Sequence, residues 1–146
     1  FTLSDSFCVD RYRSEFLELM RSGVVDIVFA NEHELKSLYT TADFDSALTA
    51  LRADATLAIV TRSADGAMAA TREEIVSVPA HPVDKLVDTT GAGDLFAAGF
   101  LHGLTSGRDL THALRLGALA AAEVISHVGP RPLVNLAQLA RDNGLG

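Results

Sequence analysis

The chain of 146 residues has one cysteine, no tryptophan and no apolar run long enough to cross a membrane. Cys8 by itself cannot form an internal disulfide, and a lone thiol fits a reducing compartment. A membrane-spanning helix needs about 18 or more apolar residues in succession, and no signal peptide is recognisable. These absences predict a cytoplasmic protein that does not work in a membrane.

Basic residues are also scarce. Twelve Lys and Arg stand against 19 Asp and Glu, which gives a formal net charge of -7. A nucleic-acid partner requires clustered Lys and Arg, so this class of partner is excluded. An ATP–magnesium site stays compatible with an acidic chain, because backbone amides and a metal ion can hold phosphates. The 48% hydrophobic and 21% charged content is ordinary for a globular domain, and the length suffices for one with a core.

Helical and strand-like patterns alternate along the chain. The patterns predict buried strands at 24–29 and 56–61, a hairpin-like pair after residue 66, and helices at 10–20, from Asn31, from Asp43, from the glycine-rich stretch to about Leu104, from Asp109 and near the C-terminus. This order favours an α/β layered domain with a largely parallel sheet. Such sheets bind ligands at the carboxyl ends of their strands. Polar clusters at 31–34 and 61–66 directly follow the two predicted strands.

The stretch "VDTTGAGDLFAAGF", residues 87–100, places three small residues and an acid where a helix begins. The first backbone N–H groups of a helix have no partner inside it, and the helix dipole adds positive charge there. With Gly91, Ala92 and Gly93 at this point, no bulky side chain would keep an anion from those amides. Asp94 would lie beside the bound anion, in position to accept a proton from an attacking hydroxyl.

Two better-known phosphate motifs do not fit this stretch. A P-loop requires a lysine, and no lysine follows Gly91 anywhere in the chain. A dinucleotide fingerprint requires a third glycine at the position of Phe96. Taken alone, the four residues 91–94 are equally well explained as a glycine-rich turn whose acid is favoured by the helix dipole.

The longer segment "DTTGAGDLFAAGF" resembles the C-terminal signature of the ribokinase-like (PfkB) carbohydrate and nucleoside kinases, and in particular bacterial sugar kinases of the adenosine-kinase-like type. The resemblance covers essentially the whole chain. It implies a three-layer α/β/α fold with a mostly parallel sheet. Residues 1–146 would form the nucleotide-binding C-terminal part, without the N-terminal substrate-binding half and its lid. The start at Phe1 rather than Met agrees with a fragment, and the family's dimerisation through the lid allows a homodimer.

The resemblance assigns roles to both polar clusters and to the glycine-rich stretch. It makes Asp94 the general base and Gly91 to Gly93 the anion hole. It places Asn31 near the phosphates and lets Glu34 organise Mg²⁺ largely through water, as Mg²⁺ keeps several waters. From the residues alone, Asn31 is read as a helix cap and Glu34 as a solvated acid of the first turn.

The segment "TRSADG", residues 61–66, is similar to the family's loop along the nucleotide. Thr61 and Gly66 match that loop, whereas Ser63 stands where glycine is common. Arg62 is read either as a phosphate contact or as an ordinary surface arginine. Gly117 occupies a position that borders the adenine in the family, although a small residue there also permits close helix packing.

The resemblance further implies a monovalent cation, such as potassium, behind the anion hole. Its backbone carbonyl ligands would come from Asp88, Thr90, Val124, His127 and Gly129. One type of family member adds a side-chain hydroxyl ligand at the position of Leu133, and leucine has no hydroxyl to offer.

The sequence thus predicts an ATP-dependent kinase that phosphorylates a hydroxymethyl group of a sugar or a nucleoside, with adenosine slightly favoured. The alternative from another class is a non-catalytic sensor that binds a nucleotide or phosphate on the same fold. Asp94 argues against the sensor, because a carboxylate repels phosphate. A purely structural α/β domain would leave the clusters at Asn31, Thr61 and Gly91 unexplained as a set.

Overall fold

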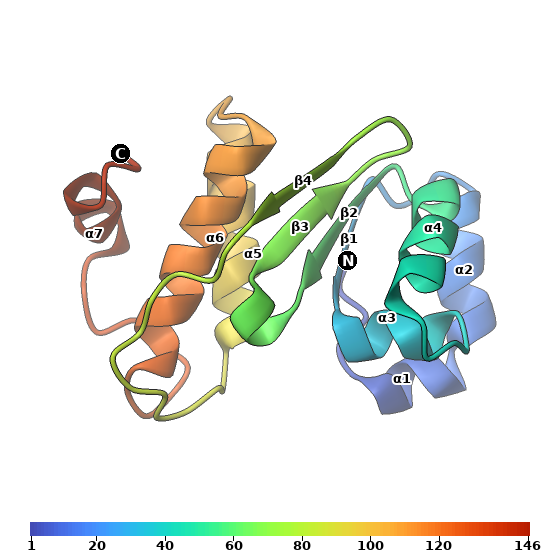
Figure 1. Ribbon diagram of the computed structural model, residues 1–146, viewed down its shortest axis with the longest axis horizontal. Helices are drawn as coiled ribbons and strands as arrows, with labels where there is room; N and C mark the ends of the chain where they lie inside the picture. The colour runs from blue at the N-terminus through green and yellow to red at the C-terminus, as the bar shows by residue number, and fades with distance from the viewer. The chain divides into compact units, whose positions relative to one another are not determined.

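The computed structural model describes all residues from 1 to 146 and divides them into two compact units (Figure 1). The first unit comprises Phe1–Arg62 and Met68–Val76, and the second comprises Ser63–Ala67 and Ser77–Gly146. None of the helices has the length and the apolar composition needed to cross a membrane.

The first unit is built on two parallel strands and four helices. The strands are β1 (Ile27–Asn31) and β2 (Leu57–Thr61), and the helices are α1 (Ser6–Arg11), α2 (Arg13–Arg21), α3 (Glu32–Leu38) and α4 (Phe44–Asp54). Ile27 pairs with Leu57 and Asn31 with Thr61, so the two strands end side by side. The core joins fully buried residues of the N-terminal segment, the strands and the helices, including Leu3, Val9, Leu35, Leu51, Ala58 and Val60.

Two sequence predictions for this unit are wrong in their bounds. The helix predicted over 10–20 is two helices, because Asp5 caps an earlier start by accepting a hydrogen bond from the Cys8 amide at 2.8 Å, and Tyr12 leaves helical geometry at φ -119°. The strand predicted at 24–29 begins only at Ile27, and Val24 before it is 70% exposed. Apolar periodicity alone shows neither the cap nor the exposure.

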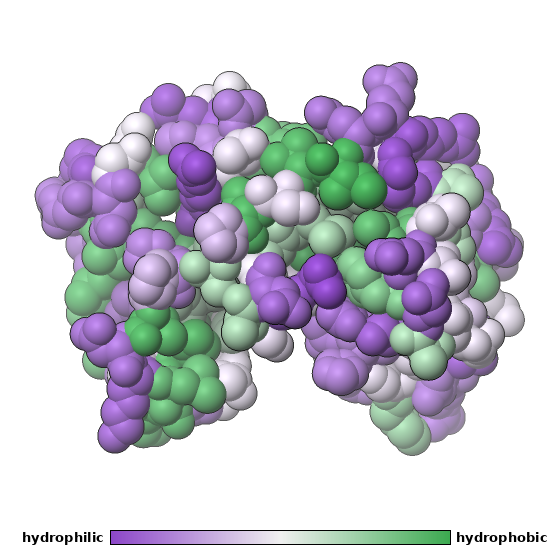
Figure 2. Space-filling view, in the orientation of Figure 1, coloured by the Kyte–Doolittle hydropathy of each residue, from purple (hydrophilic) through white to green (hydrophobic).

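The strands of the chain form one four-stranded sheet in the order β1-β2-β3-β4. A short 3-10 helix, η1 (Ser63–Asp65), precedes β3 (Ala67–Ala70), and a tight turn leads to β4 (Ile75–Val78). The Thr71 amide donates to the Glu74 carbonyl at 2.9 Å across this turn. Neighbouring strands joined by so few residues are antiparallel, which confirms the predicted hairpin and makes the sheet mixed. Figure 2 shows apolar surface over this hairpin, where Ile75 is exposed.

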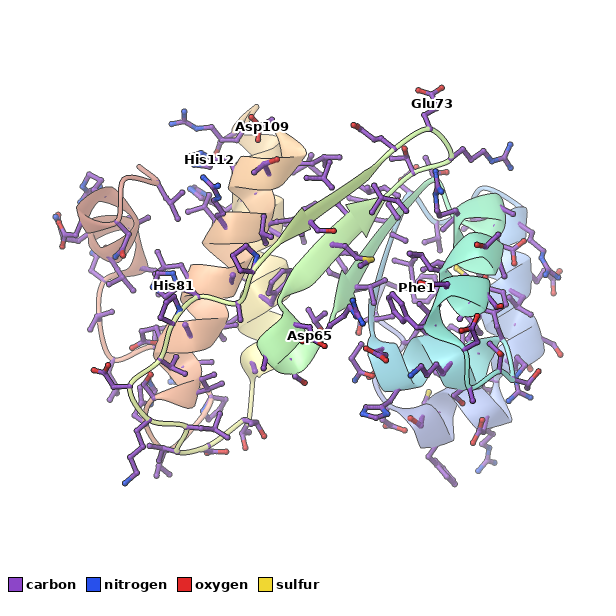
Figure 3. All side chains as sticks on the ribbon, in the orientation of Figure 1. Phe1, Asp65, Glu73, His81, Asp109 and His112 are labelled. Carbon is purple, nitrogen blue, oxygen red and sulfur yellow. The ribbon has the colours of Figure 1, made fainter.

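The second unit is dominated by the helix pair α5 (Ala92–Thr105) and α6 (Leu110–Ile125), with α7 (Leu136–Asp142) beyond them. Glycine allows the pair to approach closely, since a Cβ on Gly99 would lie 2.6 Å from the Leu116 carbonyl oxygen. The predicted cap of α6 is confirmed: Asp109 accepts a hydrogen bond from the His112 amide at 2.7 Å, and the two residues lie at the same end of the helix (Figure 3).

Candidate functional site

Asn31 and Thr61 stand at the carboxyl ends of two adjacent parallel strands, where they are direct partners in the register. Asn31 also begins α3. Its side-chain oxygen accepts from the Glu34 backbone amide at 2.9 Å, and the Asn31 backbone amide donates to Glu34 Oε2 at 2.9 Å. This reciprocal capping box explains locally why β1 ends and α3 begins at Asn31.

Glu34 is not the solvated acid that its sequence position suggests, because only 6% of it is exposed. Burial raises the pKa of its carboxyl group, and a hydrogen bond from the Asn31 backbone opposes that rise. The Asn31 side-chain amide donates to Glu34 Oε1 at 2.8 Å, so each carboxylate oxygen accepts one bond from Asn31. Each oxygen keeps accepting capacity, which fits a magnesium ion reached through water. No group of three or more His, Cys, Asp or Glu side chains is arranged to hold a metal directly.

Arg62 is held by neighbours within the first unit. Its Nε donates to Glu32 Oε2 at 3.1 Å, and its guanidinium lies 4.2 Å from the centre of the Phe44 ring. Lys36 binds the other oxygen of Glu32 at 2.6 Å, and these two cations lower the pKa of the Glu32 carboxyl, the Lys36 bond contributing most. A phosphate contact by Arg62 would therefore require it to leave Glu32.

The loop 63–66 is tightly constrained. Ser63 adopts a left-handed φ of 51°, which is the conformation that glycine adopts without strain. Gly66 has φ +88°, and a Cβ on it would overlap the Val78 carbonyl oxygen. Figure 3 shows Asp65 at the tip of this turn.

The start of α5 presents free backbone amides. Gly91 is the N-cap residue, has a left-handed φ of 80° and provides no side chain to cap the helix. Of the amides of residues 91–94, only that of Ala92 donates within the chain, to the Thr89 carbonyl at 3.2 Å. Gly93 and Asp94 are exposed, and a Cβ on Gly93 would meet nothing within 4 Å. The arrangement has the donors and the access that a phosphate-sized anion needs.

Two contacts fix this helix start to the loop after α6. Asp88 accepts from the Thr90 amide and hydroxyl at 2.9 and 2.6 Å, and its other oxygen accepts from the Gly129 amide at 2.9 Å. A Cβ on Gly91 would lie 2.7 Å from Pro130 Cβ, so only glycine fits against this loop. The segment 88–91 is therefore held in place by chain that lies some 40 residues further on.

Asp88 predicts a pH effect. The Thr90 side chain and then the Gly129 and Thr90 amides lower the pKa of its carboxyl from 3.8 to about 2. A depressed folded-state pKa stabilises the fold above the unfolded-state pKa, and this stabilisation is lost as the pH falls towards the folded value. We expect Asp88→Asn to lower the melting temperature at pH 5 and above. The difference in melting temperature between the variant and wild type should become smaller between pH 4 and pH 2. Thermal unfolding of both proteins across this range checks it. A gap independent of pH would show that the carboxylate charge is not what holds the loop.

A methyl group on Gly93 should separate function from folding. Gly93 lies in the first turn of α5 without a positive φ or a neighbour, so Gly93→Ala should leave stability unchanged or raise it by up to about 1 kcal/mol. If a phosphoryl group approaches these amides, the added methyl should lower turnover at least about 10-fold. Thermal unfolding and ADP release, measured in the full-length protein, check both parts. Unchanged turnover would place the phosphoryl group elsewhere.

Two of the segments predicted to supply carbonyl groups to a monovalent cation lie close together in the second unit, since the Asp88 side chain accepts from the Thr90 hydroxyl and from the Gly129 amide. No hydrogen bond is donated to the carbonyl oxygen of Asp88, Thr90, Val124, His127 or Gly129. Val124 is fully buried, so water from bulk solvent does not reach its carbonyl oxygen. A buried carbonyl without a donor is uncommon, and a cation would satisfy it. The residues present therefore fit such an ion.

Gly117 packs against α5. A Cβ there would lie 2.8 Å from the Phe96 carbonyl oxygen, and helix packing alone accounts for the glycine. A border to adenine at this position stays a prediction.

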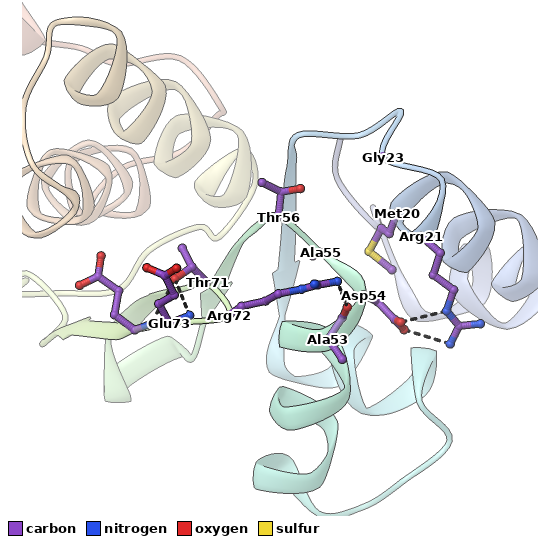
Figure 4. Close-up of a pocket in the computed structure, with 11 residues that line it drawn as sticks. Met20, Arg21, Gly23, Ala53, Asp54, Ala55, Thr56, Thr71, Arg72 and Glu73 are labelled. Carbon is purple, nitrogen blue, oxygen red and sulfur yellow. Dashed lines mark hydrogen bonds and ion pairs between the residues drawn. The ribbon is translucent and has the colours of Figure 1, made fainter.

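A surface pocket of the first unit lies at the other end of the parallel strands from Asn31 and Thr61 (Figure 4). It is lined by Thr56, immediately before β2, and by the turn between β3 and β4, so it opens at the amino end of β2, whereas Asn31 and Thr61 stand at the carboxyl ends. Three of its charged groups bind one another or the backbone: Arg21 forms two bonds to Asp54 at 2.9 and 3.0 Å, and Arg72 donates to the Ala53 carbonyl at 3.1 Å.

Sequence reasoning missed two carboxylates of the second unit. The side chain of Asp88 binds Thr90 and the loop after α6, and the signal was an aspartate two residues before a threonine, the spacing of an Asx turn. Glu123 lies in the last turn of α6, where no motif of the sequence marks it. Its partners His127 and Leu133 lie across a loop that no periodicity describes.

Comparison with known proteins places the chain in a family. Residues 3–135 match the pfkB family carbohydrate kinases. A cytidine kinase of Thermococcus kodakarensis is 36% identical in an alignment of 126 residues that covers 81% of this chain and 45% of that protein. The chain thus spans less than half the length of this relative.

Solved structures give the same result. An adenosine kinase from Sinorhizobium meliloti is 60% identical with a TM-score of 0.96, over 97% of this chain and 43% of its own. A probable sugar kinase from Rhizobium etli is 56% identical with a TM-score of 0.97, over 99% of this chain and 44% of its own. The predicted ribokinase-like α/β fold is confirmed. The chain belongs to the pfkB family of carbohydrate kinases.

Proposed function

We propose that the full-length protein is an ATP-dependent kinase that phosphorylates a hydroxymethyl group of a nucleoside or sugar, and that residues 1–146 form its nucleotide-binding part. The start of α5 carries this proposal. Free backbone amides, the absence of a capping side chain and the exposed Asp94 occur together there, and the preceding loop is held by the hydrogen bond between Gly129 and Asp88. Relatives named as cytidine and adenosine kinases favour a nucleoside acceptor, and adenosine is the acceptor we favour.

In this proposal the γ-phosphoryl group lies against the backbone amides at Gly91 to Gly93, and Asp94 faces the acceptor. The acceptor oxygen forms a bond to the γ-phosphorus while the bond from that phosphorus to the bridging oxygen of ADP breaks. The hydroxyl proton passes to the Asp94 carboxylate. Charge on the transferring group is stabilised by the amides and the dipole of α5.

The other site residues have supporting roles. Asn31 and Thr61 lie at the strand ends, where the nucleotide phosphates would lie, and the loop 63–66 would follow the ribose and adenine. Glu34 would orient a Mg²⁺ ion through water, and the ion when bound neutralises the phosphate charge. The free carbonyls behind the helix start would hold potassium. A homodimer through the lid of the full-length protein is part of the same proposal.

The substrate is tested by ADP release from Mg-ATP in the full-length protein. Adenosine, cytidine, ribose, fructose and 2-keto-3-deoxygluconate are offered separately. The proposal predicts release that depends on an acceptor, with the highest kcat/KM for adenosine. Release with a sugar alone would keep the reaction and change the substrate class. A non-catalytic sensor would bind ATP and release no ADP with any of these acceptors.

A further inference from the structure

Glu123 is a buried carboxylate with an unsatisfied oxygen. It lies in the last turn of α6, and only 9% of its side chain is exposed. Oε1 accepts from His127 Nε2 at 3.2 Å and from the Leu133 amide at 2.9 Å. Oε2 is buried and has no hydrogen-bond partner. A buried carboxyl oxygen without a hydrogen-bond partner is costly, so its occurrence calls for a ligand.

Several residues that follow Glu123 in the chain have carbonyl oxygens that accept no hydrogen bond. The next residue, Val124, contributes a fully buried carbonyl that accepts no hydrogen bond. The carbonyls of His127 and Gly129 in the following loop are also free of donors. The C-terminal end of α6 adds the negative end of a helix dipole. His127 is the one titratable group bonded to the carboxylate, and it uses Oε1.

We propose that Glu123 Oε2 is an anionic ligand of an alkali cation, shared with the carbonyl oxygens of Val124 and the loop after it. Carboxylate and carbonyl oxygens are the donors that hard cations take. Leu133, which lacks a hydroxyl to offer, instead orients the carboxylate through its backbone amide. Glu123 thus supplies the side-chain ligand that the backbone carbonyls alone do not. This inference extends the potassium site of the proposed function and rests on it.

The position of Glu123 links the cation to the anion hole. The carboxylate holds His127 and Leu133, which flank the loop segment containing Gly129 and Pro130. Gly129 donates to Asp88, and Pro130 packs against Gly91 at the start of α5. An ion bound at Glu123 would therefore order the loop on which the α5 amides depend.

The test is thermal unfolding of the full-length protein in potassium chloride and in tetramethylammonium chloride of equal ionic strength, without nucleotide or acceptor. We expect potassium to raise the Tm of wild type by roughly 2–4 °C. Glu123→Gln keeps the shape of the side chain and removes its charge, and it should abolish this rise. Glu18→Gln removes one exposed acid from α2, and this variant should retain the potassium-dependent rise in Tm. Parallel samples contain sodium, magnesium or calcium.

A rubidium or thallium soak of wild-type crystals gives a second readout, with an anomalous peak expected beside the Glu123 carboxylate. The proposal is overturned if Glu123→Gln keeps the potassium-dependent rise, because potassium would then bind without the Glu123 carboxylate. It is also overturned if only magnesium or calcium raises the Tm, or if no peak lies near Glu123. Because no reaction is measured, a potassium effect in a protein that transfers no phosphate would leave this site standing and reject the kinase. Phosphoryl transfer without an effect of potassium on the Tm would support the kinase and reject the cation site.

Discussion

Replacing Asp94 with asparagine is expected to lower kcat at least about 100-fold while the affinity for ATP stays nearly unchanged. Asn keeps the size and hydrogen-bonding reach of the side chain and cannot take the acceptor proton. A base acts mainly in the transition state, so its loss appears in kcat rather than in ground-state binding. Steady-state ADP release gives kcat, and calorimetric titration with a non-hydrolysable ATP analogue gives the affinity.

The matched control is Asp45→Asn. Asp45 is likewise an exposed acid in the first turn of a helix, α4, so the two variants lose the same favourable interaction with a helix dipole. Both should lose comparable, small amounts of stability, and only Asp94→Asn should lose turnover. Near-normal turnover in Asp94→Asn would end the assignment of Asp94 as the base.

The second large effect concerns folding. Gly66→Ala is expected to reduce the free energy of unfolding by more than about 3 kcal/mol, which is a large part of the roughly 5–15 kcal/mol that typically stabilises a domain. The new Cβ would overlap the Val78 carbonyl oxygen and would lie 2.8 Å from the Ala80 amide nitrogen, both of which are backbone atoms. Relief would require the segment after β4 to move away from the loop. The left-handed φ of +88° adds strain to the overlap.

Gly107→Ala separates these two causes. Gly107 has a φ of +76°, and a Cβ there would meet nothing within 4 Å. It should therefore show the cost of the left-handed conformation alone, about 1–2 kcal/mol. Denaturant unfolding of both variants in the full-length protein measures the difference. Equal losses would mean that the backbone after β4 gives way easily and that the loop 63–66 is not fixed by it.

Local patterns predicted the parts of the site that local interactions build. Asn31 and Asp109 were predicted as helix caps because their side chains bond amides three residues on. The start of α5 was predicted because small residues and an acid at a helix start are a local signature. The α/β class followed from the alternation of strands and helices.

Contacts between distant residues could not be predicted in this way. The bond from Gly129 to Asp88 joins residues 41 apart, and the stacking of Arg62 on Phe44 depends on where β2 ends relative to α4. Glu34 has the sequence position of a solvated acid, yet it is buried, because the capping box draws its carboxylate back to Asn31. Burial of this kind is a property of the packed chain and leaves no periodic signal.

Transfer of a phosphoryl group to an acceptor hydroxyl is followed most directly with ATP that carries a radioactive γ-phosphate. The full-length protein is incubated with Mg²⁺, labelled ATP and adenosine, with other nucleosides and sugars in parallel. We expect wild type to place the label in a phosphomonoester of an acceptor hydroxymethyl group, and Asp94→Asn to place almost none there. Label that stays in ATP with every acceptor, despite measurable ATP binding, would contradict the kinase assignment and identify a nucleotide-binding sensor.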